Sequence, residues 1–214
     1  MVQFKGMEHE RCIMNEKAIN DKISYMEATD NPLSADIGIV KDGGESWLYD
    51  VGNGDSAISG LNESYNVVLS HFHPDHIGNI GKINVRDLYV SKETFRHLPK
   101  DIKANIHIVT EPIVIGSLHI FPLPSSHSKG CLGLEVDDSY AFVGDALYCR
   151  FKDNSYVYNA QLLKDGMIIL KNLKSSMLLC SHYKGLVRSK DEVMAELEEI
   201  YSKRVKDSPE IVLS

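Results

Sequence analysis

The chain has 214 residues, of which 43% are hydrophobic and 25% charged, so it contains enough apolar side chains for the core of one globular domain. Its formal net charge of −7 argues against binding to nucleic acid or to an anionic membrane through general electrostatic attraction. No stretch approaches the roughly 20 apolar residues of a membrane-spanning helix, and the charged run 8–11 stands where a signal peptide would be apolar. We therefore expect a single domain over residues 1–214 in the cytoplasm, with neither nucleic acid nor membrane as its partner.

Short apolar or alternating runs predict strands near the N-terminal end of the chain. They are residues 23–27, 37–40 and 47–51, and the segment 41–45 contains the Asp-Gly-Gly of a hairpin turn. Residues 8–19 suit either a short helix or a loop. Asp50 lies near the end of the third run, where a turn rich in Gly and Asp begins, residue types that favour turns in their own right.

The densest group of metal-binding side chains follows the next strand. Residues 67–69 form a buried apolar run, which leads into His71-Phe72-His73-Pro74-Asp75-His76. In an extended backbone the first two histidines point the same way and can bind one ion. The proline then turns the chain, so the aspartate and the third histidine approach from another side. Buried imidazole and carboxylate groups need partners in place of water, and one metal ion can bind both kinds of group. We expect a helix from about residue 77 onward.

The remainder of the chain alternates short strands with helical patterns. Apolar runs predict strands at 87–90, 106–109, 113–115, 118–121, 132–136, 140–143 and 176–180, and helical spacing marks 92–98, 159–173 and a terminal segment from 189. Three of these strands are followed by a residue suited to metal binding, namely His127, Asp145 and His182. Because binding sites are commonly built from loops at strand ends, we expect these residues to join the 71–76 motif in one site.

Other residues that could bind metal lack this placement. We interpret the four remaining histidines, His9, His97, His107 and His119, as polar-face or surface residues. The four cysteines, Cys12, Cys131, Cys149 and Cys180, contain no Cys-x-x-Cys pair, and we expect reduced thiols that are mostly buried.

In order and spacing these motifs resemble those of the metallo-β-lactamase superfamily of metal-dependent hydrolases, over roughly residues 35–185. The resemblance implies an α+β fold with four layers, an αβ/βα sandwich in which two mixed sheets face each other and the helices lie outside. It also implies two divalent metal ions, with zinc expected and iron or manganese as alternatives. The implied ligands are His71, His73 and His127 for the first ion, Asp75, His76 and His182 for the second, and Asp145 as a bridge. Asp50 would support the metal-binding loop from behind.

The activity implied by the resemblance is hydrolysis of an ester, lactone, thioester or phosphodiester in a small-molecule substrate. Two ions can share a hydroxide that attacks at neutral pH, and Asp75 would orient it and carry a proton to the leaving group. Tyr148 lies at the position where lactonases of the superfamily place a hydroxyl that polarises the ester carbonyl, although it could equally be an aromatic that packs beside the site. Arg150, Lys152 and Lys184 either contact an anionic part of the substrate or are simply solvated.

Other branches of the superfamily match less well. True zinc β-lactamases usually lack a bridging aspartate, and the nuclease branches carry an RNA-binding arm or a domain inserted between the last aspartate and the last histidine. Glyoxalase II-like thioesterases usually have an extra helical domain after the last histidine, and the oxygen-reducing diiron branch typically has glutamate at the position of His73. The alternative that we retain is an iron-dependent oxidoreductase similar to the sulfur dioxygenases, which share most of these ligands.

Overall fold

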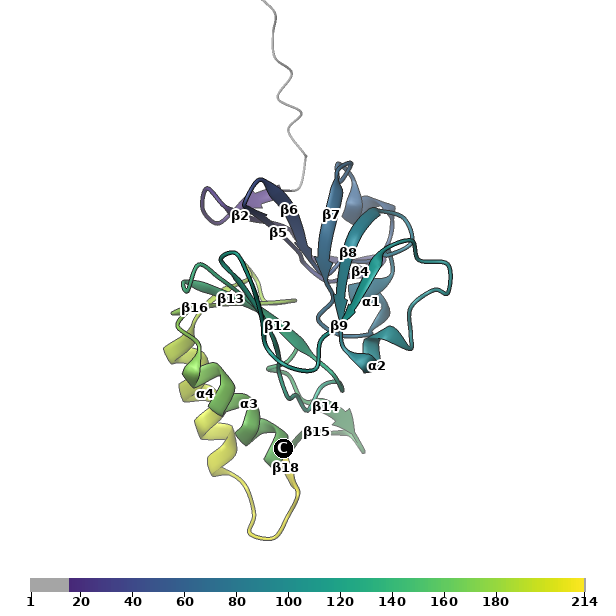
Figure 1. Cartoon of the computed structure of the whole chain (residues 1–214). Helices are drawn as coiled ribbons and strands as arrows, with labels where there is room; N and C mark the ends of the chain where they lie inside the picture. Colours follow the sequence, from purple (N-terminus) through teal and green to yellow (C-terminus); the bar gives the residue numbers. More distant parts are fainter. Residues whose placement is uncertain (1–15, 214) are drawn as a thin grey trace, which may run out of the picture.

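The computed structural model describes residues 16–213, so His9, Cys12 and most of the segment 8–19 lie outside the described residues. Two large β-sheets face each other (Figure 1). The first has the strand order β1 (Glu16–Ala18), β2 (Ile23–Met26), β5 (Ile37–Asp42), β6 (Glu45–Tyr49), β7 (Ser64–Val68), β8 (Asn84–Val90) and β9 (Asn105–Ile108). The second has the order β10 (Ile113–Ile115), β11 (Leu118–Pro122), β12 (Leu132–Val136), β13 (Tyr140–Gly144), β16 (Met177–Cys180) and β17 (Val187–Ser189).

Both sheets are mixed. In the first sheet β6, β7, β8 and β9 pair in parallel and the other neighbours are antiparallel. In the second sheet only β13 and β16 pair in parallel. Parallel neighbours end on the same edge of a sheet, so the loops that leave β6 and β7 lie together, as do those that leave β13 and β16.

The alternation of side chains along each strand divides the core into layers. Trp47, Tyr49 and Phe142 lie in the cluster between the two sheets. Leu48 lies between two of these residues in sequence and points to the opposite face, where it joins the cluster outside the first sheet. Val143 likewise faces away from Phe142 and packs outside the second sheet.

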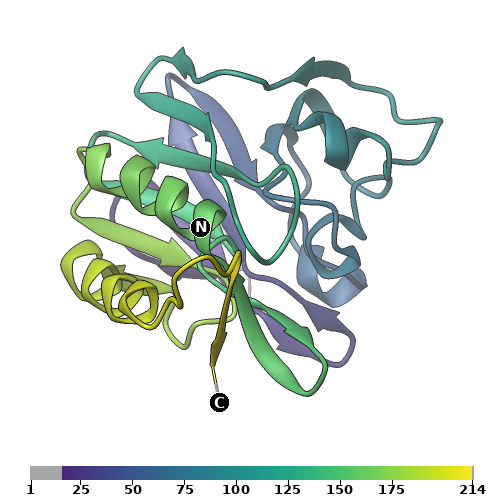
Figure 2. The ribbon, with the colours of Figure 1, turned by 90° about the horizontal axis from the view of Figure 1, so that it is seen from below.

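Helices complete the sandwich on both sides. The long helices α3 (Ala160–Asn172) and α4 (Lys190–Ser202) lie side by side over the outer face of the second sheet (Figure 2). The outer face of the first sheet is covered by short elements, the 3₁₀ helix η1 (Asp55–Ile58), α1 (Pro74–Ile77) and α2 (Lys92–Phe95). The predicted α+β sandwich with helices outside two mixed sheets is therefore confirmed.

One helix was misplaced by the sequence analysis. The helix expected from residue 77 is instead α1, which begins at Pro74 and ends at Ile77. Proline favours the first position of a helix because its missing N–H would have no partner there, so Pro74 ends the strand and starts the helix at once. At Gly78 a Cβ atom would lie 2.6 Å from Asn53 Oδ1 and 2.7 Å from the Pro74 carbonyl oxygen, so this position has no room for a side chain.

A third, smaller sheet was not predicted. It consists of β14 (Arg150–Lys152), β15 (Ser155–Asn159) and β18 (Glu210–Leu213), and a two-stranded ribbon joins β3 (Thr29–Asp30) to β4 (Leu33–Ser34). Asp153 and Asn154 connect β14 to β15, with φ values of 51° and 60° at this two-residue hairpin turn. No helix within residues 16–213 is both long enough and apolar enough to cross a membrane.

Candidate metal centre

The candidate ligands follow strands of both sheets. His71 and His73 lie between β7 and α1, and Asp75 and His76 are in α1 itself. His127 lies in the loop from β11 to β12, while Asp145 and His182 directly follow the parallel neighbours β13 and β16. The positions predicted from the sequence therefore converge on the same end of the two sheets.

Backbone contacts fix the approach of the two sheets at this end. The Leu132 N–H donates to the Ser70 carbonyl oxygen at 2.8 Å, which joins the second sheet to the loop that carries His71. Gly144 has a φ of 53°, and a Cβ atom there would lie only 2.9 Å from the Cβ of Ser70. A glycine before Asp145 thus permits both the turn and the close contact that carry this carboxylate to the histidines.

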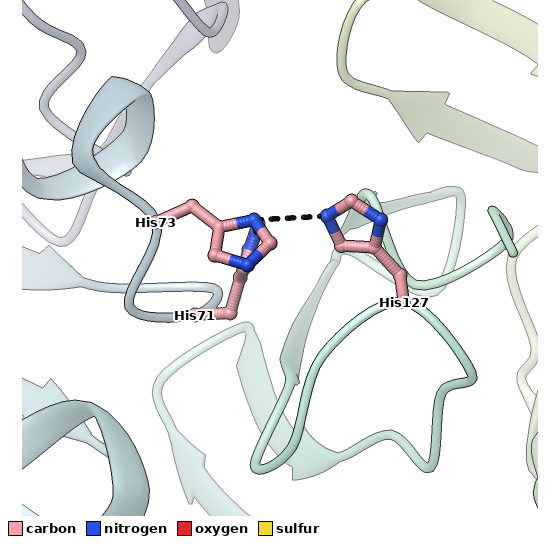
Figure 3. A group of neighbouring side chains, drawn as sticks. All are labelled: His71, His73 and His127. Atoms are coloured by element: carbon pink, nitrogen blue, oxygen red, sulfur yellow. Dashed lines mark hydrogen bonds between the residues drawn. The ribbon is translucent and has the colours of Figure 1, made fainter. Parts of the chain in front are cut away.

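Three imidazoles form the first candidate ligand group. His71 Nε2 lies 2.9 Å from His73 Nδ1, which lies 3.0 Å from His127 Nε2. Figure 3 shows the three rings pointing toward one another from the two sides of the site. Nitrogen ligands of a tetrahedral zinc ion stand roughly 3.3 Å apart, as follows from Zn–N distances of about 2.0–2.1 Å. The three nitrogens are therefore close to the spacing that one ion requires.

The second candidate group contains a carboxylate and two imidazoles. Asp75 Oδ2 lies 3.1 Å from His182 Nε2 and 3.6 Å from His76 Nε2. His76 is fully buried, whereas Asp75 and His182 are partly open to solvent. This group can accept an ion from the solvent side without movement of the buried histidine.

Asp145 lies between the two groups. Its Oδ2 atom is 3.4 Å from His127 Nε2, 3.5 Å from His76 Nε2 and 3.8 Å from His182 Nε2. Asp145 Oδ1 and His76 Nε2 are both buried without a hydrogen-bond partner. Buried polar atoms almost always have partners, so these two atoms indicate a ligand that the protein itself does not supply. Imidazole and carboxylate donors fit zinc, iron or manganese.

Asp50 supports the loop that carries the first candidate ligands. It is fully buried, and its two carboxylate oxygens each lie 2.7 Å from a donor of Ser70, the backbone N–H to Oδ1 and the hydroxyl to Oδ2. His76 Nδ1 lies 2.7 Å from Asp50 Oδ2. A carboxylate that accepts from Nδ1 fixes the ring so that Nε2 points at the metal position.

Burial and nearby carboxylates divide four of the candidate ligand histidines into two classes. Burial lowers the pKa of His71 and His73, which therefore offer free nitrogen lone pairs at neutral pH. Burial opposes a charge on His76 as well, but Asp50 and Asp145 outweigh it and raise the pKa of His76 to about 10. A hydrogen bond with Asp75 raises the pKa of His182. Without metal, His76 is thus protonated at neutral pH.

We expect metal affinity to increase with pH above neutrality. An ion must displace the proton of His76, so affinity should rise by about tenfold per pH unit. Competition with a chromophoric chelator at pH 6, 7 and 8 measures this slope. Ordinary histidines would be largely deprotonated above pH 7, so an affinity that does not change between pH 7 and 8 would contradict the assignment.

One supporting residue was missed by the sequence analysis. Asp36, directly before β5 of the first sheet, is 4% exposed, and its Oδ2 accepts a hydrogen bond from the His182 backbone N–H at 2.9 Å. Its Oδ1 accepts from the Ala28 N–H at 3.0 Å. His182 has a φ of 61°, a conformation that costs energy outside glycine, so this contact holds the residue in place. No local sequence pattern marks Asp36, because its partner is 146 positions away.

We expect Asp36→Ala to weaken binding of one ion by about 10- to 100-fold, the usual effect of losing a group that orients a ligand. The ion held by His71, His73 and His127 should bind as before. A two-step metal titration measures both affinities, and Asp30→Ala, at an exposed position of β3, is the matched control. Two affinities equal to those of wild type would show that Asp36 does not position His182.

Tyr148 lies beside the site, but its hydroxyl group is not directed at the candidate ligands. The hydroxyl donates to the Ser181 carbonyl oxygen at 2.7 Å, and its ring centroid is 6.4 Å from that of His127. Burial raises the pKa of Tyr148, so the hydroxyl keeps its proton at neutral pH. To polarise a substrate carbonyl, this proton would first have to leave Ser181. Its catalytic role stays a prediction.

The other histidines and cysteines of the described chain lie outside the candidate ligand groups. His107 pairs with Asp87 at 2.8 Å, His119 with Glu135 at 3.2 Å, and His97 stacks on Phe72. Cys131 and Cys180 are buried free thiols, and burial raises the pKa of each to about 12.

No family model and no curated protein matches the sequence. Several solved structures have a fold similar to that of this chain. A B3 metallo-β-lactamase with an active-site glutamic acid has a TM-score of 0.65 and 13% identity, with 89% of this chain and 90% of that chain covered. An archaeal metallo-β-lactamase superfamily protein from Sulfolobus tokodaii has a TM-score of 0.61 and 16% identity, with 87% and 89% covered. The flavodiiron protein from Giardia intestinalis has a TM-score of 0.65 and 12% identity, with 88% of this chain but only 59% of that chain covered. The chain therefore has the metallo-β-lactamase fold, as its sequence motifs predict.

Proposed function

We propose that the chain is a binuclear metal-dependent hydrolase, with zinc as the metal, that cleaves an ester, lactone, thioester or phosphodiester in a small molecule. The observation that carries this proposal is the position of Asp145. Its Oδ2 atom lies within 3.8 Å of Nε2 atoms from both candidate ligand groups, and its Oδ1 atom is buried without a partner. A carboxylate that lies between two groups of ligands can bridge two metal ions, as a binuclear site requires.

The residues around the two positions have distinct tasks in this proposal. Bound ions would supply a Lewis acid at the reacting oxygen and a water activated for attack. Asp50 and Asp36 hold His76 and His182 in their orientations. Burial alone would raise the pKa of Asp75, but the hydrogen bond from His182 and the nearby charges of His76 and His182 together lower it, so its carboxylate is ionised and able to accept a proton at neutral pH. Asp75 is partly open to solvent, which gives that proton a path to the leaving group.

A panel of esters, lactones, thioesters and phosphodiesters, offered to the zinc-loaded protein, tests the reaction class. We expect turnover of one bond type, and we expect Asp75→Asn to reduce kcat by about 10²- to 10⁴-fold, the range for loss of a general acid or base. Asp101→Asn, at an exposed position, is the control. Turnover of every active substrate at the wild-type rate by Asp75→Asn would contradict the proposed role.

A second candidate is an iron-dependent oxidoreductase. It is favoured by the likeness to the flavodiiron protein and by a donor set of imidazoles and carboxylates, which suits iron as well as zinc. Metal analysis of the purified protein and oxygen uptake with a persulfide separate the two. Iron content with oxygen uptake supports the oxidoreductase, whereas zinc content with hydrolysis supports the hydrolase.

A further inference from the structure

The hairpin of β14 and β15 carries two aromatic side chains that are largely exposed. Phe151 is 64% exposed and Tyr156 is 59% exposed. They stand directly opposite each other in the strand pairing and so share one face of the hairpin. Their rings contact edge to face, with centroids 5.3 Å apart. Two neighbouring large aromatics in water are a common sign of a binding surface.

These two rings form one wall of a cleft that ends at the metal centre. The cleft has a volume of about 490 Å³, and its lining includes Phe151, Tyr156, Tyr158 and Tyr148 together with His73 and His127. This volume falls in the range of roughly 300–1,000 Å³ for small-molecule sites. The cleft thus joins an aromatic surface to two of the candidate ligands of the first ion.

The hairpin is held at a fixed distance from the metal ligands. The Asn159 N–H at the end of β15 donates to Ser126 Oγ at 2.8 Å, next to His127 in sequence. The buried Tyr158 donates its hydroxyl proton to the Leu147 carbonyl oxygen at 3.1 Å, two residues after Asp145. These contacts make the aromatic wall a preformed part of the site.

The two basic residues of the hairpin share one acidic partner, and one of them, Arg150, also lines the cleft. Arg150 and Lys152 both bond to Glu210 of β18, with Lys152 Nζ 3.3 Å from Oε1. The idea that these two residues contact an anionic part of the substrate is therefore not favoured. The cleft instead offers aromatic faces to an uncharged group.

From these observations we infer that the substrate is a neutral ester, thioester or lactone with an apolar acyl or aryl group, which packs on Phe151 and Tyr156 while the scissile bond lies at the metal centre. The inference rests on the proposed hydrolase function and narrows its substrate class. A phosphodiester lies outside this narrowed class.

The test uses the zinc-loaded full chain and the double variant Phe151→Thr/Tyr156→Thr, in which β-branched residues preserve the strand. The matched control is Val114→Thr, at an exposed strand position outside the cleft. The first readout is binding of the neutral fluorescent probe N-phenyl-1-naphthylamine, which requires no turnover. We expect wild type and Val114→Thr to bind the probe and the double variant to lose at least tenfold in affinity. Equal binding by all three proteins would overturn the inference.

The second readout is kcat/KM for 4-nitrophenyl esters with acyl chains of two to eight carbons, beside bis(4-nitrophenyl) phosphate. In wild type we expect an increase of up to about fourfold for each buried methylene, and in the double variant we expect this increase to flatten. Two results would overturn the inference but leave the hydrolase function standing. The first is a higher kcat/KM for the phosphodiester than for the esters. The second is an unchanged increase of kcat/KM with chain length in a double variant that no longer binds the probe. If the double variant loses probe binding but wild type hydrolyses none of the substrates, the apolar cleft is supported and the hydrolase function is contradicted.

Discussion

Replacement of Asp145 by alanine is expected to reduce turnover by on the order of 10³-fold or more, since it removes the group that we expect to contact both ions. In wild type the Oδ2 atom lies 3.4 Å from His127 Nε2 and 3.5 Å from His76 Nε2. Without this carboxylate the second group retains only Asp75, His76 and His182. We therefore also expect the number of tightly bound ions to decrease from two to one.

Metal content and activity are measured on the same samples of wild type and Asp145→Ala. Asp101→Ala, at an exposed position, is the matched control and should keep both ions and full activity. Circular dichroism verifies that Asp145→Ala is folded. A folded variant with two tightly bound ions and near wild-type turnover would contradict the bridging role.

Replacement of Asp50 by asparagine is expected to destabilise the metal-free protein by about 3–5 kcal/mol, the usual cost of removing one partner from a buried charged pair. Asp50 is fully buried, and its carboxylate bonds to both donors of Ser70 and to His76 Nδ1. Its φ is 63°, a value that asparagine tolerates better than alanine, so this variant removes the charge with little added strain.

The loss of stability should depend on pH. The folded-state pKa of His76 is raised to about 10, whereas an unfolded histidine has a pKa of about 6.5. The stabilisation from the charged pair is therefore complete below about pH 6.5 and is lost as the pH rises toward 10. Urea unfolding at pH 6, 8 and 9.5 should give the largest difference between wild type and Asp50→Asn at pH 6. A difference that is equal at all three pH values would show that His76 is not the charged partner of Asp50.

The sequence located the candidate site well because the chemistry of its residues is local. Imidazoles and carboxylates that recur at the ends of several strands are typical of a metal site. The residues that the structure brings together include every candidate ligand from the 71–76 motif to His182. The strands that carry them could be predicted from apolar runs. The segment 113–115 matches β10 and 132–136 matches β12 residue for residue.

Features that depend on contacts between distant segments could not be predicted from the sequence. Asp36 reaches His182 across the molecule, and no pattern near either residue marks this hydrogen bond. The hairpin of β14 and β15 was overlooked although Tyr156, Val157 and Tyr158 favour a strand and Asp153-Asn154 suits a tight turn. Its third strand, β18, comes from the last residues of the described chain, so the complete small sheet could not be foreseen from local propensity.

The most direct test of the account is a crystal structure of the protein grown with excess zinc, with anomalous difference density recorded at the zinc edge. We expect two strong peaks about 3.5–4 Å apart, one beside His71, His73 and His127, the other beside Asp75, His76 and His182, with the carboxylate of Asp145 in contact with both. A single peak, or no peak among these seven residues, would contradict the binuclear centre on which the proposed function depends.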